Sequence, residues 1–129
     1  MITKAIATKE FVYALDKWTF DVINPEIKAL LINIRQLVAN NPKANSNEPV
    51  DAAFLKSIFD NPVIHNKVTQ VVDLVNDTPC RNKTPLYAVM LALSSKGLSY
   101  YAILNIPPPK HLVNVKVIST VYFNTLHEQ

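Results

Sequence analysis

Glycine is almost absent from this sequence. Gly97 is the single glycine among 129 residues, whereas proline occurs nine times. The loops that hold phosphates in P-loop proteins and in dinucleotide-binding proteins need several glycines at fixed spacing. The sequence therefore argues against both classes of nucleotide site. It also leaves proline and asparagine to make the turns.

Cysteine and long apolar runs are scarce as well. The lone Cys80 cannot form an intramolecular disulfide, and no cysteine and histidine residues have zinc-site spacing, so we expect no metal and no cofactor. No apolar run approaches the ~20 residues of a membrane helix, and the first ten residues lack the apolar region of a secretory signal. These features predict a cytoplasmic protein without a membrane partner.

Acidic residues are missing from one long stretch. Residues 78–127 contain no Asp or Glu but five basic side chains, whereas residues 1–77 contain eight basic and nine acidic ones. Such asymmetry favours an anionic partner, either nucleic acid or an acidic protein surface. The alternative is that these cations simply solubilise the surface. The oligomeric state stays open.

Proline and asparagine placement predicts helices. A chain of this length is expected to form one domain over residues 1–129. Asn24-Pro25, Asn61-Pro62 and Thr84-Pro85 each place an N-cap residue before a proline at the first helical position, and Glu48-Pro49 is a weaker start of the same kind. Apolar residues then recur at helical spacing, and the second helix should end at 40–42. Five helices are predicted, the fifth over 85–96 with Gly97 as its C-terminal cap.

The apolar spacing also predicts a core. The residues expected to be buried are Leu30, Ile34, Leu37, Val68, Val71, Val72, Val89, Leu93, Val115 and Val117.

The pattern changes after Gly97. Residues 98–106 and 113–124 are rich in Val, Ile, Tyr and Thr, as strands are, and a proline-rich loop over 107–111 separates them. The predicted fold class is therefore α+β. About five helices are followed by a C-terminal antiparallel β-hairpin packed on the helical body.

The leading functional hypothesis is a small, non-enzymatic binding or regulatory module. Its basic half, 78–127, would dock on the anionic partner, and tyrosines on the hairpin would stack against bases. The same tyrosines also suit the outer face of an ordinary sheet. The predicted partner-binding residues are Arg81, Lys83, Lys96, Lys110, His111, Lys116, Tyr101 and Tyr122.

Two alternatives remain. The first is a metal-independent ribonuclease-type enzyme, in which His111 acts as acid or base and Arg81, Lys83 and Lys110 hold phosphate. No base partner for His111 is evident in the sequence, so no catalytic residue is assigned outside this hypothesis. The second is an accessory protein, for example a viral one, that binds another protein through exposed helix faces and inhibits or regulates it.

Overall fold

The computed structural model describes residues 2–77, 95–110 and 112, and within them the chain is helical. Five helices are present in these residues: α1 (Lys4–Thr19), α2 (Pro25–Ala39), α3 (Ala52–Phe59), α4 (Pro62–Asp77) and α6 (Lys96–Ile103). None of the described helices is long and apolar enough to cross a membrane.

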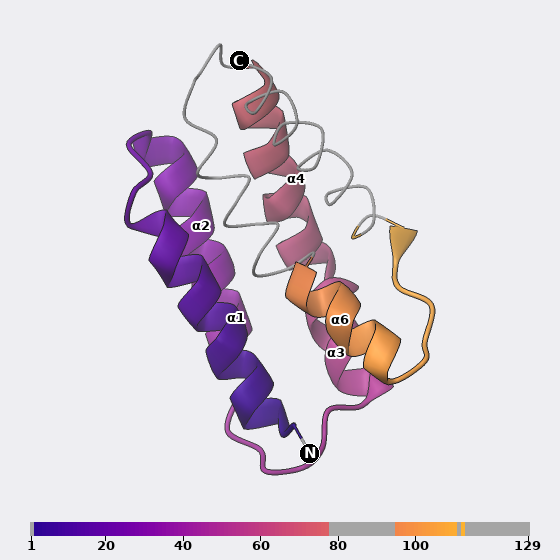
Figure 1. Ribbon diagram of the computed structural model, residues 1–129. Coiled ribbons are helices and arrows are strands. Elements are labelled where there is room, and N and C mark those ends of the chain that lie inside the picture. The colour runs from indigo at the N-terminus through magenta and orange to yellow at the C-terminus, as the bar shows by residue number, and fades with distance from the viewer. Residues whose placement is uncertain (1, 78–94, 111, 113–129) are drawn as a thin grey trace, which may run out of the picture.

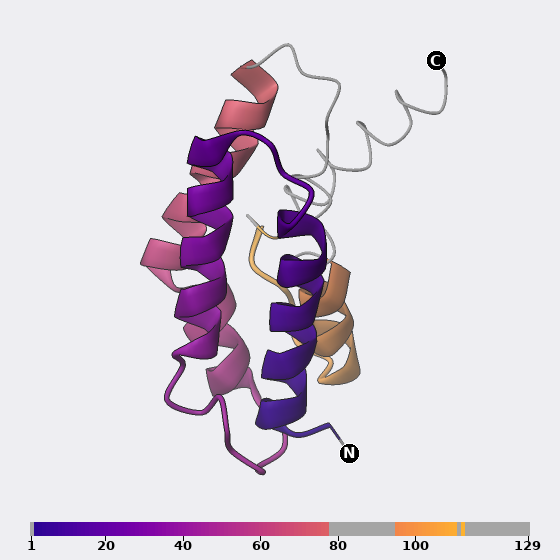
Figure 2. The same cartoon turned by 90° about the vertical axis from the view of Figure 1, so that its left-hand side faces the viewer.

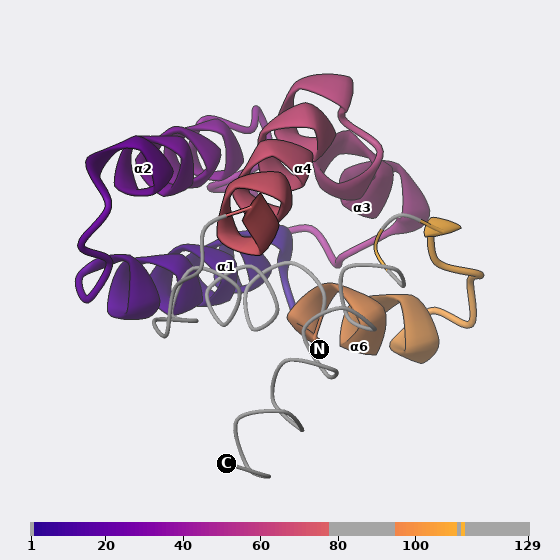
Figure 3. The same ribbon diagram turned by 90° about the horizontal axis from the view of Figure 1, so that it is seen from above.

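Helices α1 and α2 form an antiparallel pair, and α2 also packs against α4 (Figure 1). The view turned by 90° shows α1 and α2 lying along each other, with α4 on the other side of α2 (Figure 2). From above, α4 lies between α2 and α3, and α6 lies beside α1 (Figure 3). Helix α6 contacts α3 as well.

The predicted proline starts of two helices are confirmed. The side chain of Asn24 accepts hydrogen bonds from the backbone N–H groups of Glu26 and Ile27, and Pro25 is the first residue of α2. In the same way, Asn61 accepts from Val63 and Ile64 at the start of α4. The predicted end of the second helix is also confirmed, because Asn40 is the C-cap of α2.

Helix α3 begins later than the sequence predicted. Its N-cap is Asp51, whose carboxylate accepts a 2.8 Å hydrogen bond from the N–H of Phe54, rather than a residue of Asn47-Glu48-Pro49. The segment before it performs a different task. Ser46 and Glu48 accept backbone hydrogen bonds from Ala5 and Lys4 through their carbonyl oxygens, at 3.0 and 2.9 Å. These are donors that the first turn of α1 cannot satisfy by itself.

The core is formed by the inner faces of all five helices. Ile34, Val68, Val71 and Val72 are buried as predicted, whereas Leu30 and Leu37 are only half-buried. Val89, Leu93, Val115 and Val117 lie outside the described residues. Aromatic rings join α1, α3 and α6, because Phe11 makes edge contacts with Phe59 and Tyr100 at centroid distances of 5.5 Å.

The predicted β-hairpin is wrong. Its first strand, 98–106, is helix α6 up to Ile103, and no strand or sheet is present in residues 2–77, 95–110 and 112. An isolated antiparallel bridge joins Thr3 and Pro49. The second predicted strand, 113–124, and residues 85–94 of the predicted fifth helix lie outside the described residues. The last residue of that predicted helix, Lys96, is instead the first residue of α6. The physical reason for the error is that Gly97, Tyr100 and Tyr101 are buried on one side, at the three- and four-residue spacing of a helix.

Gly97 is also not the predicted C-cap, because it lies in the first turn of α6. The helix ends instead at Ile103 with Leu104 as its C-cap, and the next residue, Asn105, has a positive φ of 56°. The N–H of Ile106 donates to the carbonyl of Tyr101 at 3.0 Å, and the N–H of Asn105 donates to Ala102 at 3.1 Å. This pair of bonds is the Schellman motif, in which asparagine takes the place that glycine usually has.

Candidate functional site

Three of the predicted partner-binding residues lie in the described part of the chain: Lys96, Tyr101 and Lys110. Arg81, Lys83, His111, Lys116 and Tyr122 lie outside it, and so does Cys80. The structure therefore does not test whether the five basic residues share a face. It also does not test the acid–base role of His111 in the ribonuclease hypothesis.

Lys96 is the first residue of α6 and faces α1. Its ammonium lies 4.0 Å from Glu10 Oε2, and its side chain is partly exposed. The hydroxyl of Tyr100 donates a 2.6 Å hydrogen bond to the same carboxylate oxygen. Burial, together with the hydrogen bond to Glu10 and its charge, raises the pKa of Tyr100 well above its ordinary value. Glu10 thus pins α6 to α1 and offsets part of the Lys96 charge.

Tyr101 is not available for stacking against a partner, contrary to the sequence prediction. Its side chain is 1% exposed and its ring lies 5.9 Å from that of Phe59. Burial, with a smaller contribution from the charge of Asp60, raises the pKa of Tyr101 to about 12. Its hydroxyl has no hydrogen-bond partner in the structure as described. The strand prediction required that only one of Tyr100 and Tyr101 enter the core, whereas a helix buries both.

Lys110 follows the three prolines and is exposed. Two residues later Leu112 is buried, and its N–H donates to the carbonyl of Pro109 at 3.1 Å. The hydrogen bond is local to the segment, and the leucine, which belongs to the core cluster, anchors the end of the proline segment on the body of the protein. Lys110 is thereby presented to solvent from an anchored position.

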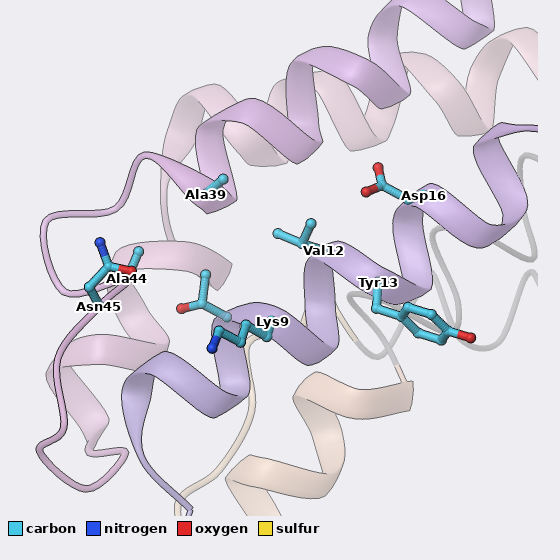
Figure 4. Close-up of a pocket in the computed structure, with 8 residues that line it drawn as sticks. Lys9, Val12, Tyr13, Asp16, Ala39, Ala44 and Asn45 are labelled. Atoms are coloured by element: carbon cyan, nitrogen blue, oxygen red, sulfur yellow. The ribbon is translucent and has the colours of Figure 1, made fainter.

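A groove lies between α1 and the end of α2 (Figure 4). It has a volume of about 340 Å³ and is lined by Thr8, Lys9, Val12, Tyr13, Asp16, Ala39, Ala44 and Asn45. Asp16 Oδ1 lies 3.4 Å from Arg35 Nε, so its carboxylate is already in an exposed ion pair. The groove thus offers one ammonium, one carboxylate and an apolar wall, which suits recognition more than catalysis.

A second pocket, of about 310 Å³, lies between the N-terminus and α6 and is lined by Ile2, Pro49, Val50, Tyr100, Ile103 and Leu104. Its lining is apolar apart from the Tyr100 hydroxyl, which is bonded to Glu10. Within the residues that the structure describes, no three His, Cys, Asp or Glu side chains gather closely enough to hold a metal ion. Neither pocket contains a paired acid and base.

Sequence reasoning missed the exposed apolar residues of the N-terminal half. Tyr13 is 70% exposed, and Phe20 and Ile23, at the turn between α1 and α2, are 83% and 85% exposed. A signal was present in the sequence, because Ile6, Tyr13 and Phe20 are spaced by seven residues and so share one face of a helix. That face is opposite the one that carries the buried Phe11 and Leu15.

Comparisons of the chain with protein-family models, with curated proteins and with solved structures found no match.

Proposed function

We propose that this chain is a small, non-enzymatic binding module of the cytoplasm whose basic half, 78–127, docks on an anionic partner. The observation that carries the proposal is the charge distribution. Residues 78–127 contain five basic side chains and no acidic one, so this half carries five formal positive charges. A surface of that sign attracts polyanions over distances of about a Debye length.

The described part of this half supports the proposal in its geometry. Lys96 and Lys110 stand on an anchored helix and an anchored loop, and both side chains reach solvent at least in part. The exposed Ser95, Ser99 and Asn105 add hydrogen-bond donors along the same segment. Cations and neutral donors held on a packed scaffold are the groups that position phosphates.

The burial of Tyr101 refines the proposed mode of binding. A tyrosine that is 1% exposed cannot stack on a base. Among the described residues of this half, the remaining contacts are charge and hydrogen bonds to a backbone, so we expect recognition to depend strongly on salt and weakly on base sequence. Among anionic partners, we therefore favour the phosphate backbone of RNA or DNA, with an acidic protein as the alternative.

The test is the salt dependence of binding. The full chain is titrated onto fluorescent single-stranded RNA and duplex DNA at several salt concentrations. We expect affinity to fall as salt rises, and each of Lys96→Ala and Lys110→Ala to reduce the salt slope by about one unit. Lys56→Ala, on the exposed side of α3, is the matched control and should leave the slope unchanged.

Three outcomes decide the question. Salt-sensitive binding to several unrelated sequences supports the proposal. Binding that is absent at low salt overturns the nucleic-acid form of it, and capture of an acidic protein after nuclease treatment would then identify the partner class. Cleavage of RNA in EDTA that is lost in His111→Ala overturns the non-enzymatic reading in favour of the ribonuclease hypothesis.

A further inference from the structure

One face of α1 carries an apolar stripe that no described element covers. Ile6, Tyr13 and Phe20 are 45%, 70% and 83% exposed. They are spaced by seven residues, which is almost two turns, so they align along the helix. The N–H of Phe20 still donates to the carbonyl of Asp16 at 3.3 Å, so the alignment continues to the end of the stripe. Figure 4 shows the Tyr13 ring directed away from α2.

Opposite charges flank this stripe in a fixed order. Lys9 and Asp16 lie on the α2 side, where both line the groove. Glu10 and Lys17 lie on the other flank, where Glu10 meets α6. Each flank thus has one charge four or three residues before Tyr13 and the opposite charge three or four residues after it. On each flank the two opposite charges therefore lie at nearly the same distance from Tyr13, one before it and one after it.

This order is complementary to itself in an antiparallel pair. When two helices are related by a two-fold axis at Tyr13, each flank faces the same flank of the other helix. Lys9 then lies within one residue, about 1.5 Å along the axis, of Asp16 in the second copy. Glu10 has the same relation to Lys17. Ile6 lies opposite Phe20, and the two Tyr13 rings meet at the axis.

We propose that α1 pairs with α1 of a second copy of this chain, antiparallel and centred on Tyr13. The pairing forms two intermolecular ion pairs between Lys9 and Asp16 around an apolar seam, and it places Glu10 near Lys17 of the other copy. The pair of Asp16 with Arg35 is compatible with it, because the Asp16 side chain is 54% exposed and keeps accessible oxygen. A second copy is the occupant that the charge order indicates, because the order along α1 is complementary to itself in an antiparallel pair.

The surface is narrow, so the dimer should be weak. A single helix pair buries less than a standard interface, which places the expected Kd in the micromolar to millimolar range. The proposal concerns α1 alone and does not depend on the partner of the basic half. Its failure would therefore leave the proposed function untouched.

The experiment is sedimentation equilibrium of the full chain with charge-reversal variants. Lys9→Glu opposes Asp16 of the other copy, and Asp16→Lys opposes Lys9, so each variant alone should raise the dimer Kd by about tenfold or more. An equimolar mixture of the two restores both attractive pairs in the mixed dimer. We expect that mixture to recover a Kd within about threefold of the original, which like-charged homodimers cannot do.

Tyr13→Glu provides a second disruption that leaves the flanking charges in place, because it brings two carboxylates together at the axis. Lys56→Glu on α3 is the matched control and should leave the Kd unchanged. Unfolding midpoints of all variants confirm that each is folded. A chain that stays monomeric as its concentration is raised, a dimer indifferent to Lys9→Glu and Tyr13→Glu, or a mixture that recovers nothing would each overturn the proposal.

Discussion

Gly97 lies directly against the ring of Phe59, so that a Cβ at this position would stand 2.7 Å from Phe59 Cζ and 2.8 Å from Cε1. The ring has little room to withdraw. Phe59 is 4% exposed and packs against Phe11 on one side and Tyr101 on another. The single glycine of the chain therefore serves close packing between α3 and α6.

Gly97→Ala should destabilise the protein. In an exposed helix, alanine would stabilise by about 1 kcal/mol relative to glycine. Here the added methyl group overpacks a filled site, and we expect a net loss of about 1–3 kcal/mol in the free energy of unfolding. Denaturant unfolding measures it. Ser99→Ala, at an exposed position of the same helix, is the control and should change stability by less than ~0.5 kcal/mol. A gain of stability at Gly97 would contradict the close packing.

The sequence was sufficient for the helices that begin with an asparagine and a proline. Asn24 and Asn61 cap α2 and α4 because the bond from the side chain to the first N–H groups is local. The start of α3 was misplaced because Glu48 accepts a hydrogen bond from Lys4 and Pro49 forms a bridge with Thr3, which are contacts of long sequence separation. No local sequence pattern predicts such a contact.

Helix α6 was mistaken for a strand because tyrosine and isoleucine were weighed as strand formers. Propensity is overridden here by packing, since Phe11 and Phe59 receive the two tyrosines on one face. Because of this error, Tyr101 was expected to be exposed and to contact a partner. The true signal was Asn105 shortly before the prolines, which marks a helix end as well as glycine does.

Asn105 should therefore be replaceable by glycine but not by a β-branched residue. Its φ of 56° is unfavourable for most side chains, and a left-handed residue other than glycine or asparagine costs about 1–2 kcal/mol. We expect Asn105→Val to lower the free energy of unfolding by at least that amount, and Asn105→Gly to match or exceed the original. The matched pair is Asn40→Val and Asn40→Gly at the end of α2, where φ is −87°. If the difference in the free energy of unfolding between the glycine and valine variants is the same at both positions, the positive φ of Asn105 carries no strain.

Lys4 should make the protein sensitive to acid. Its side chain is only 5% exposed, and its ammonium lies 3.2 Å from Asp51 Oδ2 and 3.6 Å from Glu48 Oε1. A hydrogen bond from Ser46, then the charge of Lys4, holds the pKa of Glu48 below its ordinary 4.5. The N–H of Phe54, then Lys4, does the same for Asp51 below its ordinary 3.8. Lowered pKa values contribute stability that is present above these ordinary values and is lost as the pH falls through the folded ones.

Lys4→Met keeps the buried stem and removes the ammonium. We expect its stability to fall less steeply than that of the original chain as the pH drops from about 4.5. The remaining slope reports the bonds from Ser46 and Phe54. Chemical denaturation across this pH range measures both slopes, and Lys43→Met, whose ammonium is exposed, should alter the slope less. Identical acid slopes in Lys4→Met and the original chain would mean that the buried ammonium does not contribute to the loss of stability in acid.

The hydroxyl of Tyr101 should destabilise the fold and limit its stability in alkali. It is buried without a hydrogen-bond partner in the described structure, and such a group costs about 1–3 kcal/mol. We expect Tyr101→Phe to raise the free energy of unfolding by about 1 kcal/mol at neutral pH. A loss of similar size would show that the hydroxyl is hydrogen-bonded after all, through a water molecule for example.

The pKa of Tyr101 is raised from its ordinary 10.0 to about 12, so the neutral phenol is the form that the fold accepts. The stability that depends on the neutral phenol is therefore fully present below pH 10 and is lost as the pH rises toward 12. The stability of Tyr101→Phe should accordingly decline less over that interval, while Tyr13→Phe, at a residue 70% exposed, should follow the original chain.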